Sequence, residues 1–346
     1  MIKRIFAVGA VALALAACSK KNDKKDSSAA GAKGVSGAVA ASEENTQELP
    51  KLAITDSAGV YKLSYHLEEG KTYPFTTVQK DVTTIKDPTG KSVSGTQEIK
   101  DEMSFKVNDF KDGVYSITVN LIGKSVKSTS NGQQVVIDTK GNEPKEEQFK
   151  AMWILNKALS GNQLEMKLGE NGEIRSITGF DAVYSKVDKA MAAVIKDAKQ
   201  RAQFLTNFKQ GFGEAILKEQ YSKSLNILPK KGVKIGEQWS ESENISQDGK
   251  IKLTTTYQLD KVEGGEAVIS VSGGIPKKSN SEKNGEMTHS MSVEGTQKGS
   301  LHIDAQTGWM KTSTQTMNTT QTESISNGKE TQTMTKVNNS TVTINP

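Results

Sequence analysis

The stretch that decides the fold reads FKVNDFKDGVYSITV, at residues 105–119. Apolar and polar residues alternate on both sides of Asp112-Gly113. A period of two is typical of a strand with one buried face, and an Asp-Gly pair supplies the positive φ angles of a tight hairpin. The stretch therefore predicts two antiparallel strands joined by a short turn.

The same pattern returns in YQLDKVEGGEAVISV, at residues 257–271. At one constant offset and without a gap, residues of like kind match in both stretches: Phe105 with Tyr257, Val107 with Leu259, Phe110 with Val262, Gly113 with Gly265, Tyr115 with Ala267, Ile117 with Ile269 and Val119 with Val271. Gly70-Lys71-Thr72-Tyr73 and Gly236-Glu237-Gln238-Trp239 form a second match, each opening a strand. An internal repeat of this length indicates a duplicated unit.

The rest of the chain also reads mainly as strands. Residues 61–67 and 250–257 alternate, and residues 312–322 are rich in the threonine that suits pleated surfaces. Further turns are indicated at Asn131-Gly132, Asn171-Gly172, Asp248-Gly249, Gly264-Gly265 and Asn327-Gly328. The expected fold class is mainly β (α+β), with two pseudo-repeated antiparallel halves at about residues 50–179 and 229–346.

Between the halves, residues 180–228 predict a helical insertion. One apolar face at helical spacing carries Val183, Val187, Met191, Val194 and Ile195. Asp181 is the expected N-cap, and a second apolar set contains Phe204, Leu205, Phe208 and Phe212. A shorter helix is expected near Pro144, with Phe149, Met152 and Trp153 inward. Such helices usually pack on the open face of a sheet, so we expect them to complete the core.

The first residues predict an exported lipoprotein. Lys3 and Arg4 precede an apolar run that is too short to span a bilayer, and residues 15–18 read Leu-Ala-Ala-Cys. This is the pattern of a signal peptide over residues 1–17, cleaved before Cys18, which is the single cysteine and the expected lipidation site. Palmitate or a similar acyl group would anchor the protein in the membrane. Ser19 favours the outer membrane of the cell envelope, with the domain facing either the periplasm or the cell surface.

Residues 18–49 form a predicted flexible tether, because they contain almost no large apolar side chain. Residues 50–346 are then expected to form one β-rich domain. The whole chain carries a small net charge of +5, and only three of the chain's 45 basic residues are arginine. Clustered arginine is typical of nucleic-acid binding, so this composition argues against a nucleic-acid partner.

No histidine indicates catalysis. His66 is expected to face solvent, opposite Tyr65 and Leu67. Ser300, His302 and Asp304 have the residue types of a serine-hydrolase triad, but they alternate along one strand. Alternate residues lie about 6.5–7 Å apart, whereas a triad needs contacts of about 2.6–3.2 Å. We therefore expect no catalytic residue, no enzyme and no cofactor.

Met287, His289 and Met291 share one face of a predicted strand. Thioethers and imidazole suit Cu(I), so copper binding is a remote alternative, although methionine also fills gaps in ordinary cores. Met310, Met317 and Met334 lie in nearby predicted strands. No zinc or calcium spacing is present, so the sequence assigns no metal site.

The chain resembles secreted lipoproteins of Bacteroidota that are grouped as domain of unknown function 6263. The similarity lies in residues 67–73, 105–119, 164–179, 228–239 and 299–309, which are turn and core residues. Family members usually have aspartate before the tryptophan segment, where this chain has Glu237. The resemblance implies an exported, lipid-anchored β domain and no activity.

Together these features predict a non-catalytic envelope lipoprotein with an apolar or lipid-like ligand. A cavity lined by Phe204, Phe208, Met191 and sheet aromatics would favour this function. The alternative is a structural or protein-interaction module with a solid core, and Trp153, Trp239 and Trp309 are expected to anchor that core. The expected partners are the membrane through Cys18 and either a lipid-like ligand or an envelope protein.

Overall fold

Nearly all strands of the described chain join one antiparallel sheet. The structure is a computed structural model that describes residues 52–130, 132–246 and 251–346. The predicted signal peptide, Cys18 and the whole predicted tether (residues 18–49) lie outside these residues, as do Asn131 and Asp248-Gly249.

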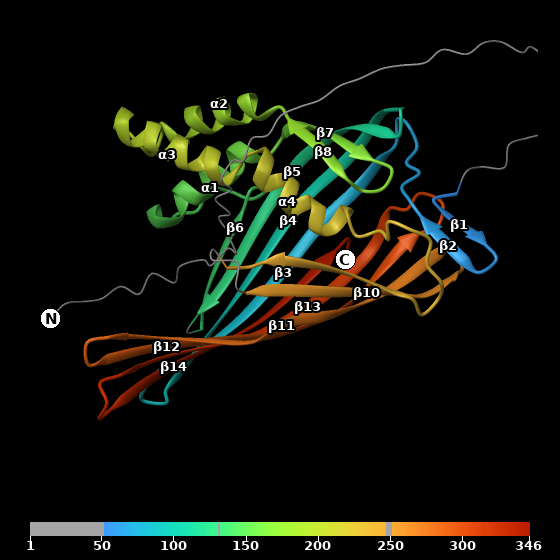
Figure 1. Cartoon of the computed structure of the whole chain (residues 1–346). Helices are drawn as coiled ribbons and strands as arrows, with labels where there is room; N and C mark the ends of the chain where they lie inside the picture. Colours follow the sequence, from blue (N-terminus) through green and yellow to red (C-terminus); the bar gives the residue numbers. More distant parts are fainter. Residues whose placement is uncertain (1–51, 131, 247–250) are drawn as a thin grey trace, which may run out of the picture.

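The main sheet has twelve strands, and a small ribbon of β1 (Ile54–Ser57) and β2 (Val60–Leu63) lies beside it (Figure 1). The strands of the first half are β3 (Thr72–Lys86), β4 (Ser92–Lys111), β5 (Val114–Ser130), β6 (Gln133–Asp138), β7 (Asn162–Gly169) and β8 (Ile174–Thr178). Those of the second half are β9 (Gln238–Asn244), β10 (Lys252–Glu263), β11 (Glu266–Asn284), β12 (Met287–Asp304), β13 (Met310–Ser326) and β14 (Thr331–Ile344).

The strand order shows the repeat directly. The sheet runs β8-β7-β5-β4-β3-β14-β13-β12-β11-β10-β9, with β6 paired to the far part of β5. Strands β8-β7-β5-β4-β3 and β13-β12-β11-β10-β9 therefore follow each other in the same sense, with β14 between them. The predicted fold class, a mainly antiparallel β protein with helices packed on its sheet, is confirmed.

The two matched hairpins share their irregularities as well as their residues. In β4, Asn108 is an extra residue between Val107 and Asp109, and in β10 Asp260 is the equivalent extra residue. Asn108 donates to Thr118 Oγ1 at 2.8 Å, and Asp260 accepts from Ser270 Oγ at 3.1 Å. A β-bulge at a given position is typically retained within a protein family, so its repetition at matched positions of the two hairpins supports duplication.

In each half, one turn packs against a segment from elsewhere in the chain. Gly172, in the β7–β8 turn, lies so close to the Leu225 carbonyl that an added Cβ would meet its oxygen at 2.2 Å. Gly308, before β13, lies equally close to the Ser64 carbonyl, whose oxygen would be 2.2 Å from an added Cβ. Both glycines have positive φ angles, 86° and 71°. The segment that leads into each half therefore packs on the turn of the other half.

An aromatic cluster fills the space between the sheet and α4 (Glu214–Leu225). The Phe105 ring lies 5.2 Å from that of Phe75, 5.4 Å from that of Trp309 and 5.9 Å from that of Tyr221. Tyr221 comes from α4, Phe75 from β3 and Phe105 from β4, and Trp309 directly precedes β13. Aromatic burial of this kind is a large contribution to stability, and it makes this part of the core solid.

The other helices lie over the first half of the sheet (Figure 1). They are α1 (Glu147–Leu159), α2 (Phe180–Met191) and α3 (Ala198–Gly211). The predicted stripe of α2 is right for Val183, Val187 and Met191, which are buried. None of the described helices is long and apolar enough to cross a membrane.

Three details of the helix prediction are wrong. Val194 is 41% exposed, because α2 ends at Met191 and the following residues form a turn. Gly179, in the left-handed conformation, precedes α2, so Asp181 lies in its first turn and is not its cap. Met152 is 44% exposed, because α1 directs its neighbours Trp153 and Ile154 inward.

Candidate functional site

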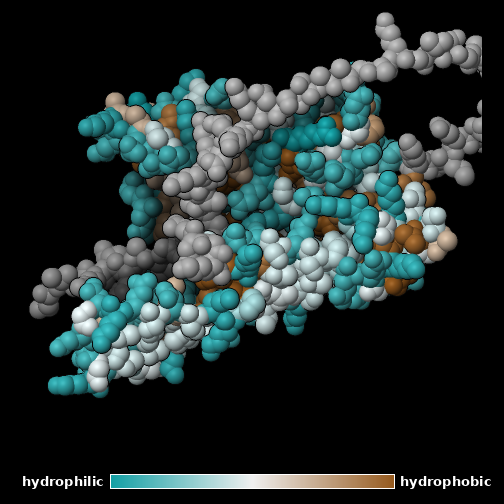
Figure 2. Space-filling model, in the orientation of Figure 1, coloured by the Kyte–Doolittle hydropathy of each residue, from teal (hydrophilic) through white to brown (hydrophobic). Residues whose placement is uncertain are grey.

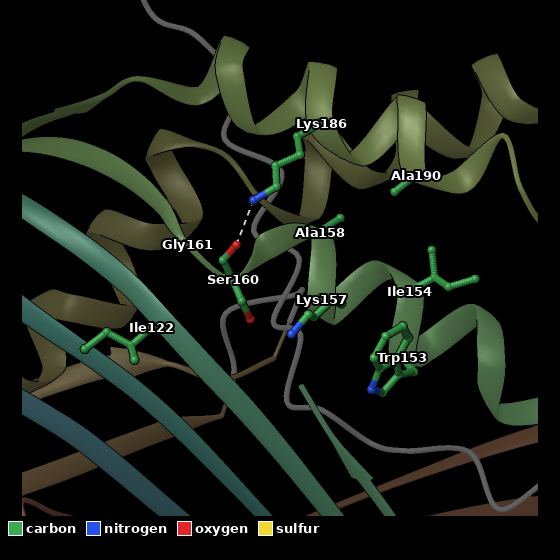
Figure 3. A pocket seen from close by; sticks show the side chains of 9 residues that line it. All are labelled: Ile122, Trp153, Ile154, Lys157, Ala158, Ser160, Gly161, Lys186 and Ala190. Carbon is green, nitrogen blue, oxygen red and sulfur yellow. Dashed lines mark hydrogen bonds between the residues drawn. The ribbon is translucent and has the colours of Figure 1, made fainter. Parts of the chain in front are cut away.

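A hollow of about 530 Å³ lies between α1, α2 and β5 (Figure 3). Its walls are mostly apolar, with two lysines among them. The lining residues are Ile122, Trp153, Ile154, Lys157, Ala158, Ser160, Gly161, Lys186 and Ala190. Ligand sites in proteins typically have volumes of about 300–1,000 Å³, apolar walls and a few polar groups.

A β-bulge in β5 brings Ile122 to this hollow. Glu102 pairs with Gly123 and Met103 with Leu121, so Ile122 is an extra residue that faces no partner on β4. Its side chain is 45% exposed. A bulge re-aims side chains and ends regular pairing, which here leaves an apolar residue at the edge of the hollow.

Helix α1 forms the second wall. The Trp153 indole donates to the Asp138 carbonyl at 2.9 Å, which fixes the ring beside the end of β6. Gly161, just after the helix, donates to the Leu121 carbonyl at 2.6 Å and ties α1 to the bulge. The wall is therefore held by hydrogen bonds to β5 and β6, independently of any ligand.

Two lysines reach the hollow from different helices. Lys157 Nζ, from α1, donates to the Thr139 carbonyl at 2.6 Å, and Lys186 Nζ, from α2, donates to the Ser160 carbonyl at 2.8 Å (Figure 3). Within the described residues, neither ammonium group forms an ion pair with a carboxylate. An ammonium has three donors, so each lysine keeps donors that these carbonyls do not use.

The residues predicted to line a cavity lie elsewhere. Met191 is buried in the core, while Phe204 and Phe208 stack on one another along α3, with ring centroids 6.2 Å apart. Phe208 also meets Tyr184 of α2, 6.1 Å between the ring centroids. These side chains join α2 to α3, and none of them lines the hollow.

A smaller hollow of about 330 Å³ lies between the end of β14 and the loop before β13. Tyr73 and Trp309 line it together with Glu68, Lys71 and Asp304. The carboxylate of Asp304 accepts from the backbone and hydroxyl of Thr307, at 2.8 Å each, so it holds its own loop. The polar groups here serve the loop structure.

His302 and Asp304, which the sequence analysis considered and rejected as members of a triad with Ser300, have other partners in the structure. His302 Nδ1 lies 3.1 Å from Glu266 Oε1 on the neighbouring strand. Hydrogen bonds from His302 and Lys311 lower the pKa of Glu266. His302 is therefore engaged with Glu266, and Asp304 is engaged with the loop that follows it.

His66, expected to face solvent, is half-buried, and its backbone N–H donates to the Thr307 carbonyl at 2.9 Å.

Met287, His289 and Met291 do share one face of β12, as the alternation predicts. Met287 and Met291 are 44% and 38% exposed. The Met291 sulfur lies 3.7 Å from Nε2 of Gln321 on the neighbouring strand β13. Gln321 pairs with Val293, so this contact lies on the side of Met291 that is away from His289. A copper site would require Met291 to turn back toward His289. Among the described residues, no three His, Cys, Asp or Glu side chains gather as metal ligands.

The three tryptophans differ in their surroundings. Trp309 is 5% exposed and anchors the core, as predicted. Trp239 is half-buried and stacks on Tyr257 with ring centroids 5.6 Å apart. Trp153, also half-buried, is a wall of the hollow.

The sequence analysis missed the site residues Ile122, Lys157 and Lys186. One signal was available for the first, because Leu121-Ile122-Gly123 breaks the alternation of β5 and a glycine within a strand often marks a bulge. The two lysines carry no such signal. They are two of many in the chain, and only the packing of α1 against α2 brings them to one hollow.

Comparison with protein families gives one match. The sequence model described as a family of unknown function (DUF6263) matches residues 112–310, more than half of the chain. A comparison with curated proteins by sequence gives no match.

Comparison with solved structures gives only distant likenesses. A structure titled as lipid–protein interactions in lipovitellin has a TM-score of 0.38 and 9% identity, over 80% of this chain and 25% of that one. A loop-deletion mutant of the outer membrane protein OmpT of Vibrio cholerae has a TM-score of 0.15 and 8% identity, over 80% and 100%. An outer membrane channel from Pseudomonas putida F1 has a TM-score of 0.18 and 9% identity, over 81% and 97%. The chain thus spans about a quarter of lipovitellin, and all three scores are too low to carry an argument about function.

Proposed function

Since the chain belongs to that family of unknown function, we propose a function from its own residues: a non-catalytic, lipid-anchored envelope protein that binds an apolar or lipid-like molecule in the hollow between α1, α2 and β5. The observation that carries the proposal is the hollow itself. Its walls include Ile122, Trp153 and Ile154, and its volume of about 530 Å³ lies within the range of ligand sites.

The proposed anchor fits this function. Cys18 lies outside the described residues, at the end of an apolar run with a small-residue cleavage pattern. An acyl chain there would keep the domain at the membrane, where lipid-like ligands occur. We expect Cys18→Ser to move the protein from the membrane pellet to the soluble fraction. Recovery of that variant in the pellet would contradict lipid anchoring.

Native mass spectrometry of the full chain carrying Cys18→Ser tests ligand binding without detergent. The expected spectrum has a reproducible mass excess that solvent extraction removes. Ala190→Trp should abolish this excess, because Ala190 lines the hollow from α2. Ala182→Trp is the matched control, because Ala182 is exposed on the same helix and does not line the hollow. A bare mass, unchanged after incubation with membrane lipids, would overturn the proposal.

The alternative function is a structural or interaction module with a solid core. Two observations favour it: the aromatic cluster around Phe105 is filled, and the sheet extends as an arm beyond the helices (Figure 1). The arm is largely hydrophilic to neutral in Figure 2. Recovery of one envelope protein in stoichiometric amount with the full chain, together with a bare mass, would establish this alternative.

A further inference from the structure

The two lysines of the hollow lie beside apolar side chains and form no ion pair among the described residues. Other lysines of the chain do pair with carboxylates, such as Lys124 with Asp101 at 2.8 Å. Lys157 and Lys186 contact only backbone carbonyl oxygens and, for Lys157, the Trp153 ring at 5.9 Å from the centroid. Positive charge is thus placed beside an apolar wall without a carboxylate to neutralise it.

The two kinds of wall lie next to each other. Trp153, Ile154 and Ile122 supply apolar surface, whereas Lys157 and Lys186 bring ammonium groups to the same hollow (Figure 3). A ligand that uses both must have an apolar body and a negative end. An apolar molecule alone would contact only the apolar walls and leave the two exposed ammonium groups to water.

We propose that the hollow binds a single-chain lipid whose anionic head, a carboxylate or a phosphate, lies between Lys157 and Lys186. This rests on the proposed function and specifies its ligand class. The acyl chain packs on Trp153, Ile154 and Ile122, and the head accepts hydrogen bonds from both ammonium groups. Hydrogen bonds between charged partners are stronger than neutral ones, so the head contributes to affinity as well as orientation.

The size of the hollow favours one acyl chain over two. Its volume of about 530 Å³ lies in the lower half of the range for drug-sized ligands, and one side is open to solvent. Ala158 and Ala190 are the small residues that keep the space between α1 and α2 free. A two-chain phospholipid would extend beyond these walls.

Three ligands with the same chain length test the proposal: palmitate, 1-palmitoyl lysophosphatidate and hexadecanol, which has no charge. Binding is measured by isothermal titration calorimetry on the full chain with Cys18→Ser, below the aggregation concentration of each ligand. The expected result is that at least one anionic ligand binds about tenfold more tightly than hexadecanol. Palmitate and lysophosphatidate distinguish a carboxylate head from a phosphate head.

The double variant Lys157→Gln/Lys186→Gln should weaken binding of the anionic ligand about tenfold and leave hexadecanol unchanged. The control is Lys189→Gln/Lys199→Gln, which removes the same charge from exposed positions on α2 and α3 outside the hollow. Equal binding of hexadecanol and the anionic ligands would overturn the headgroup assignment and leave the proposed function intact. Absence of binding for all three ligands would overturn both.

Discussion

The β4–β5 hairpin and the β10–β11 hairpin have the same construction, but the chain continues from them differently. Both hairpins have one extra residue at matched positions, Asn108 and Asp260. After β11 the chain enters β12 directly through a tight turn. After β5 it forms the short strand β6, which pairs with β5, and then helix α1, before β7 pairs with the other part of β5.

This difference shows where the candidate site comes from. The shared hairpins supply the sheet and the core, whereas the bulge at Ile122 and the inserted α1 supply two walls of the hollow. The second half has no counterpart of α1 within the described residues between β11 and β12. The repeated hairpins therefore account for the scaffold, and the bulge with the added helices α1 and α2 accounts for the site.

The largest effect expected is at the aromatic core. Phe105→Ala should lower the free energy of unfolding by about 3–5 kcal/mol, because the side chain is fully buried among three other aromatic rings. Its repeat equivalent Tyr257 has a ring contact with Trp239 alone among the aromatic pairs of the described residues, so Tyr257→Ala should cost less, about 2–3 kcal/mol. Urea denaturation measures both. Equal losses would show that the two halves contribute equally to the core.

The two turns that contain Gly172 and Gly308 should respond alike. Gly172→Ala and Gly308→Ala each place a Cβ 2.2 Å from a carbonyl oxygen and force a positive φ on alanine, so each should cost about 2–4 kcal/mol. Gly113→Ala and Gly265→Ala are controls with positive φ and open space, and should cost about 1–2 kcal/mol. If the first pair costs no more than the controls, the contact between halves is less tight than described.

Alkaline pH should destabilise the fold through its buried tyrosines. Burial raises the pKa of Tyr65, Tyr221 and Tyr257 above the ordinary value of 10.0. Above pH about 10 the unfolded chain loses these protons and the folded chain keeps them, so stability falls as pH rises, by about 1.4 kcal/mol per pH unit for each tyrosine.

Tyr221→Phe should reduce the fall in the free energy of unfolding above pH 10 by about 1.4 kcal/mol per pH unit, the contribution of one tyrosine. At neutral pH it should change stability little, because the Tyr221 hydroxyl donates only to the Met103 sulfur, at 3.2 Å. The measurement is urea unfolding from pH 9 to pH 11.5. Parallel curves for the variant and the original chain would contradict the assignment of Tyr221.

The smallest effect concerns the matched bulges. Asn108→Ala removes the hydrogen bond to Thr118 across the hairpin and a longer one, 3.5 Å, to Glu165 of β7. Asp260→Ala removes the bond from Ser270 across the hairpin and one from Gln258 of the same strand at 3.0 Å. Each should cost about 0.5–1.5 kcal/mol. Thermal unfolding measures the loss of stability in both variants. Losses that differ from each other by more than about 1 kcal/mol would mean that the two bulges have different roles.

The scaffold was predictable from the sequence because its determinants are local. Alternation around Asp112-Gly113 and its recurrence around Gly264-Gly265 are visible in a short stretch, and they predict both hairpins. The helical stripe of Val183, Val187 and Met191 is equally local. The end of α2 was not predictable, because Val194 continues the apolar pattern after the helix has ended.

The site depends on contacts between distant segments. Lys157 and Lys186 come from helices separated by β7 and β8, and Ile122 comes from a strand before both. Each reads in the sequence as an ordinary surface or strand residue. The predicted cavity residues Phe204 and Phe208 failed to reach the sheet because their rings stack along α3 and against α2.

The most direct test of the central claim is photo-crosslinking of the full chain with Cys18→Ser to palmitate that carries a terminal diazirine. Peptide mapping by mass spectrometry should find the label around Ile122 in β5 and around Trp153 and Ile154 in α1, with competition by unlabelled palmitate. Label on β11–β13, or spread equally over both halves, would contradict the conclusion that the site belongs to the addition in the first half.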